Sequence, residues 1–273
     1  MRAFRVDVNE RDEDVATALL WEAGTCGLEV QPAAGETVAL VAYFPAGGTT
    51  VESLRARLPF AKIAETAVPD VDWSARFRET FRPFRVGRFA VTPAWEPSSG
   101  PDLLPLVVDP GRAFGTGTHE TTRLCLAALE QVAARRPLKR VIDVGAGTGI
   151  LAVAAARLGA SFVVASDVDP DATASSRHHA RLNSVRLRVV RGDGGRPFRE
   201  SSFDVVVANL TAPILSARAG EIAGLVGARG ALVLSGLLGT DLLEVQAAYV
   251  ACGRPRRLDD GEWVALLYEG PAG

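Results

Sequence analysis

The stretch "VIDVGAGTGIL", Val141 to Leu151, decides the fold of this chain. A short apolar run ends in Asp143, three glycines follow at every second position (Gly145, Gly147 and Gly149), and helix-forming residues come next. A strand that leads through a tight glycine turn into a helix forms a ligand site at the carboxyl edge of a parallel sheet. The stretch therefore predicts a nucleoside or anion site at this turn.

The spacing of the glycines narrows the class of ligand. Dinucleotide dehydrogenases use G-x-G-x-x-G, whereas here the third glycine comes one residue early and an acid precedes the first, which gives D-x-G-x-G-x-G. This spacing resembles the methyltransferase motif that binds S-adenosylmethionine. Glycine backbones let the methionine part of that cofactor lie close to the turn, and Asp143 can accept hydrogen bonds from its cationic amino group. A glycine turn with a purely structural role is the alternative.

Acidic residues follow the next two strands. Asp167 ends "SFVVASD" about twenty residues beyond the glycines, where an acid can accept hydrogen bonds from both ribose hydroxyls. Asp169, just before Pro170, is expected to cap the next helix. Asp193 follows the third strand, "RLRVVRG". Its carboxylate lies either near the adenine amino group or in a solvent-exposed turn.

The fourth strand, "FDVVVAN", ends in Asn209. An amide there can accept a hydrogen bond from an amine and direct the lone pair of that amine along the methyl–sulfur axis. We expect Asn209 and the backbone carbonyl of Leu210 to aim the amine. The alternative is an asparagine that caps the helix beginning near Ala212.

The stretch "DPGRAFGTGTHETTRLCL" comes before the first strand of the sheet. Its glycine-bearing loop runs into an amphipathic helix, with Thr118 as the expected N-cap and Glu120 in the first turn, where an acid is favoured. Phe114 and the hydroxyls of Thr121 and Thr122 are placed to reach the cofactor. We expect Phe114 to screen the transferred methyl group from water.

The histidines and cysteines give weaker signals. His119 is either a base or a histidine that contacts the backbone at the start of a helix, and His178 and His179 are expected on an exposed helix face. The chain has three widely spaced cysteines, Cys26, Cys125 and Cys252. Without a C-x-x-C pair they indicate small buried thiols in a reducing compartment rather than a disulfide framework or a zinc site. No metal is expected.

Strands and helices alternate through the larger part of the chain. Apolar strands linked by helices indicate a parallel sheet covered on both faces. We therefore expect residues 101–273 to form an α/β domain with the Rossmann-like sheet of class I methyltransferases. Two strand-like pieces at its end, 255–258 and 263–268, are expected to add an antiparallel hairpin.

The first part of the chain follows another pattern. Residues 1–67 have the order β-α-β-β-α-β, which is the ferredoxin-like motif, and are expected to recognise a substrate or merely to aid solubility. Residues 68–100 are expected to be a connector that contains a helix. Trp73, Phe77 and Phe81 recur every four residues there, and this places them on one helix face that packs against a neighbouring domain.

Length and charge limit the remaining possibilities. The chain has 273 residues and a net charge of −2, so one large or two smaller domains are expected, with no surface for direct contact with nucleic acid. The N-terminus has no apolar segment typical of a signal peptide, and no stretch approaches the ~20 apolar residues of a membrane span. We expect a cytoplasmic monomer.

Several stretches together resemble one known family. "VVDPGRAFGTGTHETTRLCL", "VIDVGAGTGILAVAAARLGA", "SDVDPDA", "VVVANL" and "GEWVALLY" are similar to the ribosomal protein L-eleven methyltransferases, and "DWSARFRETFRPFRVG" is similar to the linker of that family. The resemblance runs from about Asp72 to Tyr268, whereas the first 67 residues agree in pattern only. The family positions that bind the cofactor fall on Thr122, Gly145, Asp167 and Asn209.

The resemblance implies a bacterial enzyme that transfers methyl groups from S-adenosylmethionine to ribosomal protein L-eleven of the large subunit. It implies trimethylation of lysine ε-amines and of the N-terminal α-amine, with the N-terminal domain as the substrate-recognition domain. Two alternatives are an N-methyltransferase for another protein or small-molecule amine and a non-catalytic module that binds S-adenosylmethionine. A nicotinamide dehydrogenase is disfavoured by the glycine spacing.

Overall fold

The structure is a computed structural model that describes residues 2–25, 27–32, 35, 37–45, 47–67, 81–97, 100, 102–109 and 119–270. The chain divides into two compact units, Met1–Asp72 and Trp73–Gly273. The helix face expected from Trp73 and Phe77 lies outside the described residues.

The N-terminal unit has the predicted β-α-β-β-α-β order. Its elements are β1 (Arg2–Asn9), α1 (Glu13–Glu22), β2 (Gly27–Pro32), β3 (Thr37–Phe44), α2 (Val51–Arg57) and β4 (Lys62–Thr66). The four strands pair antiparallel in the order β2-β3-β1-β4. Alternate residues of β1 are buried, and Phe4 meets Phe44 edge to face. The ferredoxin-like prediction is confirmed.

The C-terminal unit is built on a large mixed sheet. Its strands are β8 (Arg140–Val144), β9 (Phe162–Asp167), β10 (Arg188–Arg191), β11 (Phe203–Asn209), β12 (Val226–Leu238), β13 (Arg256–Asp260) and β14 (Trp263–Glu269). They lie in the order β10-β9-β8-β11-β12-β14-β13, the first five mutually parallel, and β14 antiparallel to both neighbours. The predicted α/β sheet and its terminal hairpin are confirmed.

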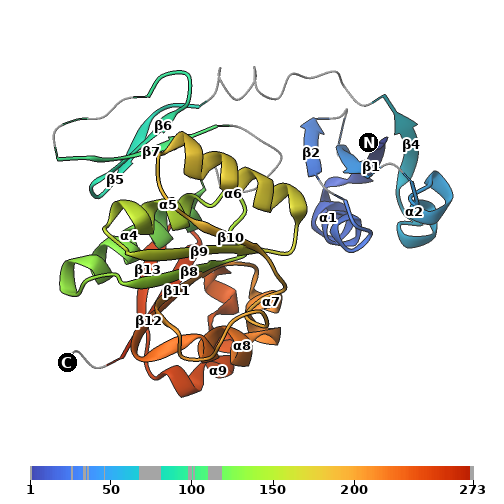
Figure 1. The fold of residues 1–273 in the computed structure, drawn as a ribbon. Coiled ribbons are helices and arrows are strands. Elements are labelled where there is room, and N and C mark those ends of the chain that lie inside the picture. The colour runs from blue at the N-terminus through green and yellow to red at the C-terminus, as the bar shows by residue number, and fades with distance from the viewer. Residues whose placement is uncertain are drawn as a thin grey trace. The chain divides into compact units, whose positions relative to one another are not determined.

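Helices cover both faces of this sheet, as Figure 1 shows. They are α4 (Glu120–Arg135), α5 (Ile150–Arg157) and α6 (Pro170–Leu182), and on the other face α7 (Ala212–Ala217), α8 (Ala219–Gly224) and α9 (Leu242–Ala248). Successive strand residues point to opposite faces, so Val141 joins the core under α4 and α5 while Ile142 joins the core under α7 and α8. This two-sided burial explains why the strands are apolar runs.

A small third sheet corrects the prediction for residues 68–100. Its strands are β5 (Phe84–Val86), β6 (Phe89–Pro93) and β7 (Leu104–Val108), in the order β5-β6-β7. Phe81, Phe89 and Val91 are buried in one core with Leu126 and Leu129 of α4. The described part of the expected connector therefore belongs to the C-terminal unit, because its apolar residues alternate into that core.

Two further expectations can be compared with the described residues. Cys125 is buried and Cys252 is partly buried, both as free thiols, whereas Cys26 lies outside the described residues. Among the described residues there is no helix with the length and apolar character needed to cross a membrane.

Candidate functional site

The carboxyl ends of neighbouring parallel strands bring the predicted site residues to one edge of the sheet. Asp143 in β8 is in register with Ala165 of β9 and Val207 of β11. Asp167 and Asn209 are the last residues of β9 and β11. Side chains far apart in the sequence therefore lie at the same edge, which is where ligands bind in open parallel sheets.

The glycine turn after β8 is held tightly by hydrogen bonds. The backbone N–H groups of Gly145 and Ala146 donate to the carbonyl oxygen of Ser166, at 2.8 and 3.0 Å. Gly145, Gly147 and Gly149 have φ values of 73°, 54° and 76°, a region that other residues rarely adopt. A Cβ on Gly145 would overlap Cδ2 of Leu210. The turn thus needs glycine for its backbone angles, and the side chain of Leu210 lies close against Gly145.

Asp143 is a buried carboxyl group that is only half satisfied. Its side chain is 1% exposed, and Oδ2 accepts a hydrogen bond from the backbone N–H of Ala152 at 3.2 Å. Oδ1 is buried and has no hydrogen-bond partner among the described residues. Burial raises the pKa of Asp143 to about 7, with a smaller contribution from the charge of Asp167. A cationic group near Oδ1 would offset this cost of burial.

The titration of Asp143 gives a testable pH dependence. Its ordinary pKa of 3.8 rises to about 7 in the folded chain, so between these pH values the folded chain binds more protons than the unfolded chain. Stability of the ligand-free protein should therefore fall as pH rises from about 4 to about 7, by a few kcal/mol at most. Thermal unfolding of Asp143→Asn across this range should lack the decline. The same variant of exposed Asp171 should keep it, and a decline of equal size in Asp143→Asn would contradict the assignment.

The carboxylate of Asp167 organises the turn around it. Its Oδ2 accepts from the backbone N–H of Gly147 at 2.9 Å, and its Oδ1 accepts from the backbone N–H of Asp169 at 3.0 Å. Each carboxylate oxygen keeps a second lone pair for a ligand hydroxyl. Asp169 caps α6, as predicted, through a hydrogen bond from the N–H of Asp171.

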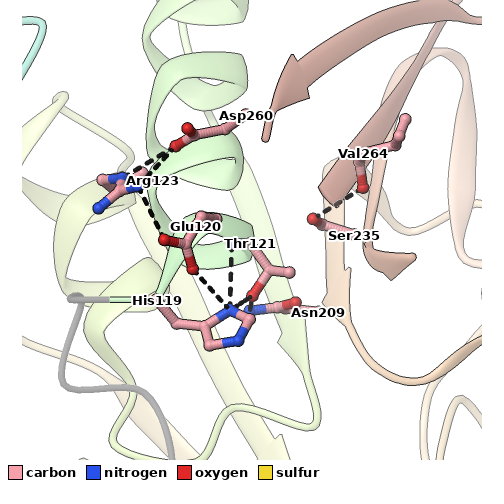
Figure 2. A network of polar contacts seen from close by, with 8 residues as sticks. All are labelled: His119, Glu120, Thr121, Arg123, Asn209, Ser235, Asp260 and Val264. Atoms are coloured by element: carbon pink, nitrogen blue, oxygen red, sulfur yellow. Dashed lines mark hydrogen bonds and ion pairs between the residues drawn. The ribbon is translucent and has the colours of Figure 1, made fainter. Parts of the chain in front are cut away.

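Asn209 faces the first turn of α4 rather than its own downstream helix (Figure 2). Its Nδ2 donates to Oγ1 of Thr121 at 3.2 Å. The N-cap of α7 is Thr211, which makes no side-chain capping bond, so the alternative of Asn209 as a helix cap is wrong. The hydrogen bond of the Asn209 side chain to the described residues is thus made by Nδ2.

Leu210 lies between the glycine turn and β12. Its backbone N–H donates to the carbonyl oxygen of Ser235 at 3.0 Å. A Cβ on Gly236 would overlap the carbonyl oxygen of Leu210. Gly236 was not among the predicted site residues, although a glycine inside a strand signals a bulge or a close backbone approach. The strand is indeed irregular between Leu234 and Leu237.

The start of α4 differs from the prediction in one detail. The N-cap is His119, whose Nδ1 accepts from the backbone N–H of Thr121 at 3.3 Å. Thr118 is therefore not the cap, and it lies outside the described residues together with Phe114. Thr122 is 1% exposed, and its Oγ1 has no hydrogen-bond partner in the part of the chain that the structure describes.

Ion pairs hold the first turn of α4 against the terminal hairpin. Arg123 donates to Asp260 of β13 at 2.9 Å and to Glu120 at 3.1 Å. The ring of His119 meets the ring of Trp263 in β14 edge to face, with 4.7 Å between centroids. The first turn is thus fixed by residues about 140 positions away, and these long-range partners carry no local sequence signal.

Asp193 follows β10 at the same edge of the sheet. Its carboxylate forms ion pairs with Arg218 and, at 3.4 Å, with Arg196, and its side chain is 44% exposed. The residue therefore has features of both alternatives, since it is partly exposed yet held in place by two arginines.

His179 contradicts the expectation of an exposed helix face. It is 1% exposed, its Nδ1 donates to the carbonyl oxygen of Ser175 at 3.0 Å, and its Nε2 accepts from the backbone N–H of Asp109 at 3.1 Å. Burial lowers the pKa of His179, consistent with a neutral ring. His178 is more exposed and lies 2.9 Å from Oδ2 of Asp109.

Asn183 also forms hydrogen bonds to the backbone at the outer edge of β7. Its Oδ1 accepts from the N–H of Val107 and its Nδ2 donates to the carbonyl oxygen of Val107, both at 2.8 Å. Two side chains of the α6 region thus take the place of a neighbouring strand. They fix the end of β7 where the chain enters the "FGTGT" stretch.

Removal of the Asn183 amide should destabilise the C-terminal unit. Asn183→Ala leaves both partly buried backbone groups of Val107 without the amide partner, and an unsatisfied group costs about 1–3 kcal/mol when it is buried. We expect the free energy of unfolding to fall by about 2–4 kcal/mol, measured by urea denaturation. Arg181→Ala changes an exposed side chain nearby and should alter stability little; equal effects of the two variants would contradict this account.

Comparisons with known proteins point to one family. A family model described as "Ribosomal protein L11 methyltransferase (PrmA)" matches residues 4–270. A "Ribosomal protein L11 methyltransferase" of Geobacter sulfurreducens is 43% identical over 212 residues, which cover 74% of this chain and 68% of that protein. One of Myxococcus xanthus is 35% identical and covers 97% of this chain and 96% of that protein.

One solved structure is similar to this chain in both fold and sequence. The crystal structure of a ribosomal protein L11 methylase from Lactobacillus delbrueckii subsp. bulgaricus matches with a TM-score of 0.62 and 28% identity. The match covers 70% of this chain and all of that chain. Similarity in sequence and in fold thus point in the same direction.

Proposed function

Because the chain belongs to the ribosomal protein L11 methyltransferase family, we propose that it trimethylates amines of ribosomal protein L11. It is an enzyme that uses S-adenosylmethionine as its methyl donor. The proposed acceptors are lysine ε-amines and the N-terminal α-amine. The observation in the structure that carries the proposal is the close approach of the Leu210 side chain to Gly145. It places the residues proposed to aim the amine beside the turn proposed to bind the cofactor.

The residues at the glycine turn suit the cofactor. The unpartnered Oδ1 of Asp143 offers a buried anionic acceptor for the cationic amino group of the methionine part. The unpartnered hydroxyl of Thr122 is a second buried polar group that would bind the cofactor. Gly145, Gly147 and Gly149 have no side chains to block a close approach. These five residues form the proposed binding site for the methionine part.

The nucleoside part of the cofactor would lie along the ends of β9 and β10. We assign the ribose hydroxyls to the carboxylate of Asp167, which two backbone N–H groups already hold in place. Asp193 would accept from the adenine amino group while Arg218 and Arg196 orient its carboxylate. Asn209, at the end of β11, completes the proposed set of cofactor residues.

The acceptor amine must lose a proton before it attacks. A lysine ammonium has a pKa of ~10.4, so near neutral pH about one molecule in a thousand is nucleophilic, at a cost of ~4 kcal/mol. An apolar site and a neighbouring cation both favour the neutral amine. The proton can leave to water, so the proposal assigns no base to His119.

Alignment is the main contribution that the protein can make to the reaction. When bound, S-adenosylmethionine supplies an electrophilic methyl group on a sulfonium. Oδ1 of Asn209 and the carbonyl oxygen of Leu210 would accept hydrogen bonds from the amine and aim its lone pair at that methyl group. Good orientation lowers a barrier by up to ~7–11 kcal/mol. Phe114 is proposed to screen the methyl group, and it lies outside the described residues.

The N-terminal unit is proposed to recognise ribosomal protein L11. Val15, Val30 and Phe60 expose large apolar side chains on this unit and are proposed as contacts for that protein. The separate ferredoxin-like core allows the unit to carry recognition while the larger unit carries the chemistry. We keep the expectation that the enzyme acts as a monomer without direct contact to nucleic acid.

Mass spectrometry of the acceptor tests the proposed function. The full chain is incubated with S-adenosylmethionine and recombinant ribosomal protein L11, and the methylated peptides are then identified. We expect mono-, di- and trimethylated forms of lysines and of the N-terminus to appear in order. Methylation of another acceptor instead would indicate a different N-methyltransferase. Cofactor binding without any S-adenosylhomocysteine would indicate a non-catalytic module.

A further inference from the structure

A chain of three polar groups ends at Asn209 (Figure 2). Nδ2 of Asn209 lies 3.2 Å from Oγ1 of Thr121, and this Oγ1 lies 2.8 Å from Nδ1 of His119. The backbone N–H of Thr121 also points at Nδ1 of His119, at 3.3 Å. Thr121 is thus the only side chain in the described structure that contacts both the asparagine amide and the imidazole.

The backbone N–H of Thr121 indicates which group donates in each of these hydrogen bonds. Because the backbone N–H of Thr121 lies 3.3 Å from Nδ1 and Oε2 of Glu120 lies further away at 3.9 Å, we assign that ring nitrogen as the acceptor. The hydroxyl of Thr121 must then donate to Nδ1, since it is the only proton donor in that contact. Its oxygen therefore accepts from Asn209, which assigns Nδ2 to the side facing Thr121 and Oδ1 to the opposite side.

This orientation matters for the reaction. An oxygen that faces the amine accepts its N–H groups and leaves the lone pair of the amine unengaged. An amide turned by a half rotation would present N–H donors, which would bind that lone pair and block the nucleophile. We propose that Thr121 is a positioning residue that, together with His119, fixes the amide of Asn209 with its oxygen toward the acceptor amine. This inference rests on the proposed function.

The surroundings of Thr121 support a rigid role. Its side chain is 1% exposed. The turn that carries it is held by the pairs of Arg123 with Asp260 and Glu120. His119 packs on Trp263 of the neighbouring hairpin. The hydroxyl of Thr121 is therefore fixed in position from both α4 and β14, and it can restrict the amide to one orientation.

Kinetics of three variants test the proposal. Thr121→Val keeps the shape of the side chain but removes the hydroxyl, and we expect kcat with ribosomal protein L11 to fall about tenfold through loss of one orienting hydrogen bond. KM for ribosomal protein L11 should stay within about twofold, because the contacts that bind substrate and transition state equally are unchanged. Thr121→Ser keeps the hydroxyl and should restore kcat. A full kcat in Thr121→Val, or an equal loss in Thr121→Ser, would overturn the proposal.

A double-mutant cycle separates positioning from a general structural effect. If Thr121 acts through Asn209, then Thr121→Val added to Asn209→Ala should change kcat by less than about twofold. The same tenfold loss in both backgrounds would mean that Thr121 does not act through Asn209.

A measurement without turnover distinguishes this inference from the proposed function. In nuclear magnetic resonance spectra of the cofactor-free chain, the side-chain amide signals of Asn209 are identified as those lost in Asn209→Ala. They should be shifted and broadened in Thr121→Val and near their original positions in Thr121→Ser. Unchanged signals in Thr121→Val would overturn the inference whether or not the wild-type chain methylates ribosomal protein L11. Absence of methylation by a chain with the expected signals would overturn the proposed function instead.

Discussion

Asn209→Ala is expected to lower kcat for methylation of ribosomal protein L11 about a hundredfold, because a misplacement of about 1 Å in a reacting group can cost that much. The variant removes the amide oxygen proposed to aim the amine and leaves the carbonyl of Leu210 as the remaining group proposed to orient it. Oγ1 of Thr121 also loses its donor at 3.2 Å. The effect should therefore fall on the chemical step more than on cofactor binding. Steady-state kinetics and calorimetry with S-adenosylmethionine measure the two separately.

A neighbouring residue provides the control for Asn209. Thr211 is exposed and makes no side-chain capping bond to α7, so Thr211→Ala should keep the wild-type kcat. The dissociation constant of S-adenosylmethionine in Asn209→Ala should rise by no more than about tenfold, which corresponds to about 1.4 kcal/mol. Full turnover with normal cofactor affinity in Asn209→Ala would show that the assignment of Asn209 is wrong.

Local patterns in the sequence predicted the parts of the site that depend on topology. A parallel sheet brings the ends of its strands to one edge, and so Asp143, Asp167 and Asn209 meet although 66 residues separate the first from the last. The β-α-β-β-α-β order of the N-terminal unit followed from periodicity together with turn residues, because short helices and strands there alternate with clear turn signals.

The contacts that the sequence did not reveal are those between distant elements. The pair of histidines in "SSRHHARL" reads as polar and exposed, yet His179 is buried because its ring accepts from the backbone N–H of Asp109, just beyond the end of β7. Strands as short as β5 cannot be recognised from three residues. The link from Asn209 to Thr121 spans 88 positions, and only the packing of α4 on the sheet brings the two together.

The largest effect on the active-site backbone is expected from Gly236→Ala. Gly236 has a φ of 89°, where an L-residue such as alanine costs about 1–2 kcal/mol. Its new Cβ would also overlap the carbonyl oxygen of Leu210 and lie 2.8 Å from its carbonyl carbon. Such a clash with backbone cannot be relieved by a side-chain rotation, and it adds about 1–3 kcal/mol. Because that carbonyl is proposed to aim the amine, kcat should fall about a hundredfold or more.

Gly239 supplies a matched control three residues further along the chain. A Cβ there meets no atom within 4 Å, and its φ is not among the positive values found for other glycines. Gly239→Ala should therefore leave kcat unchanged, while Gly236→Ala loses activity and also melts about 6–12 °C lower. Kinetics and thermal unfolding of both variants make the comparison. If Gly236→Ala retains normal turnover, the carbonyl of Leu210 has no role in aiming the amine, because a displacement of that group would then be without consequence.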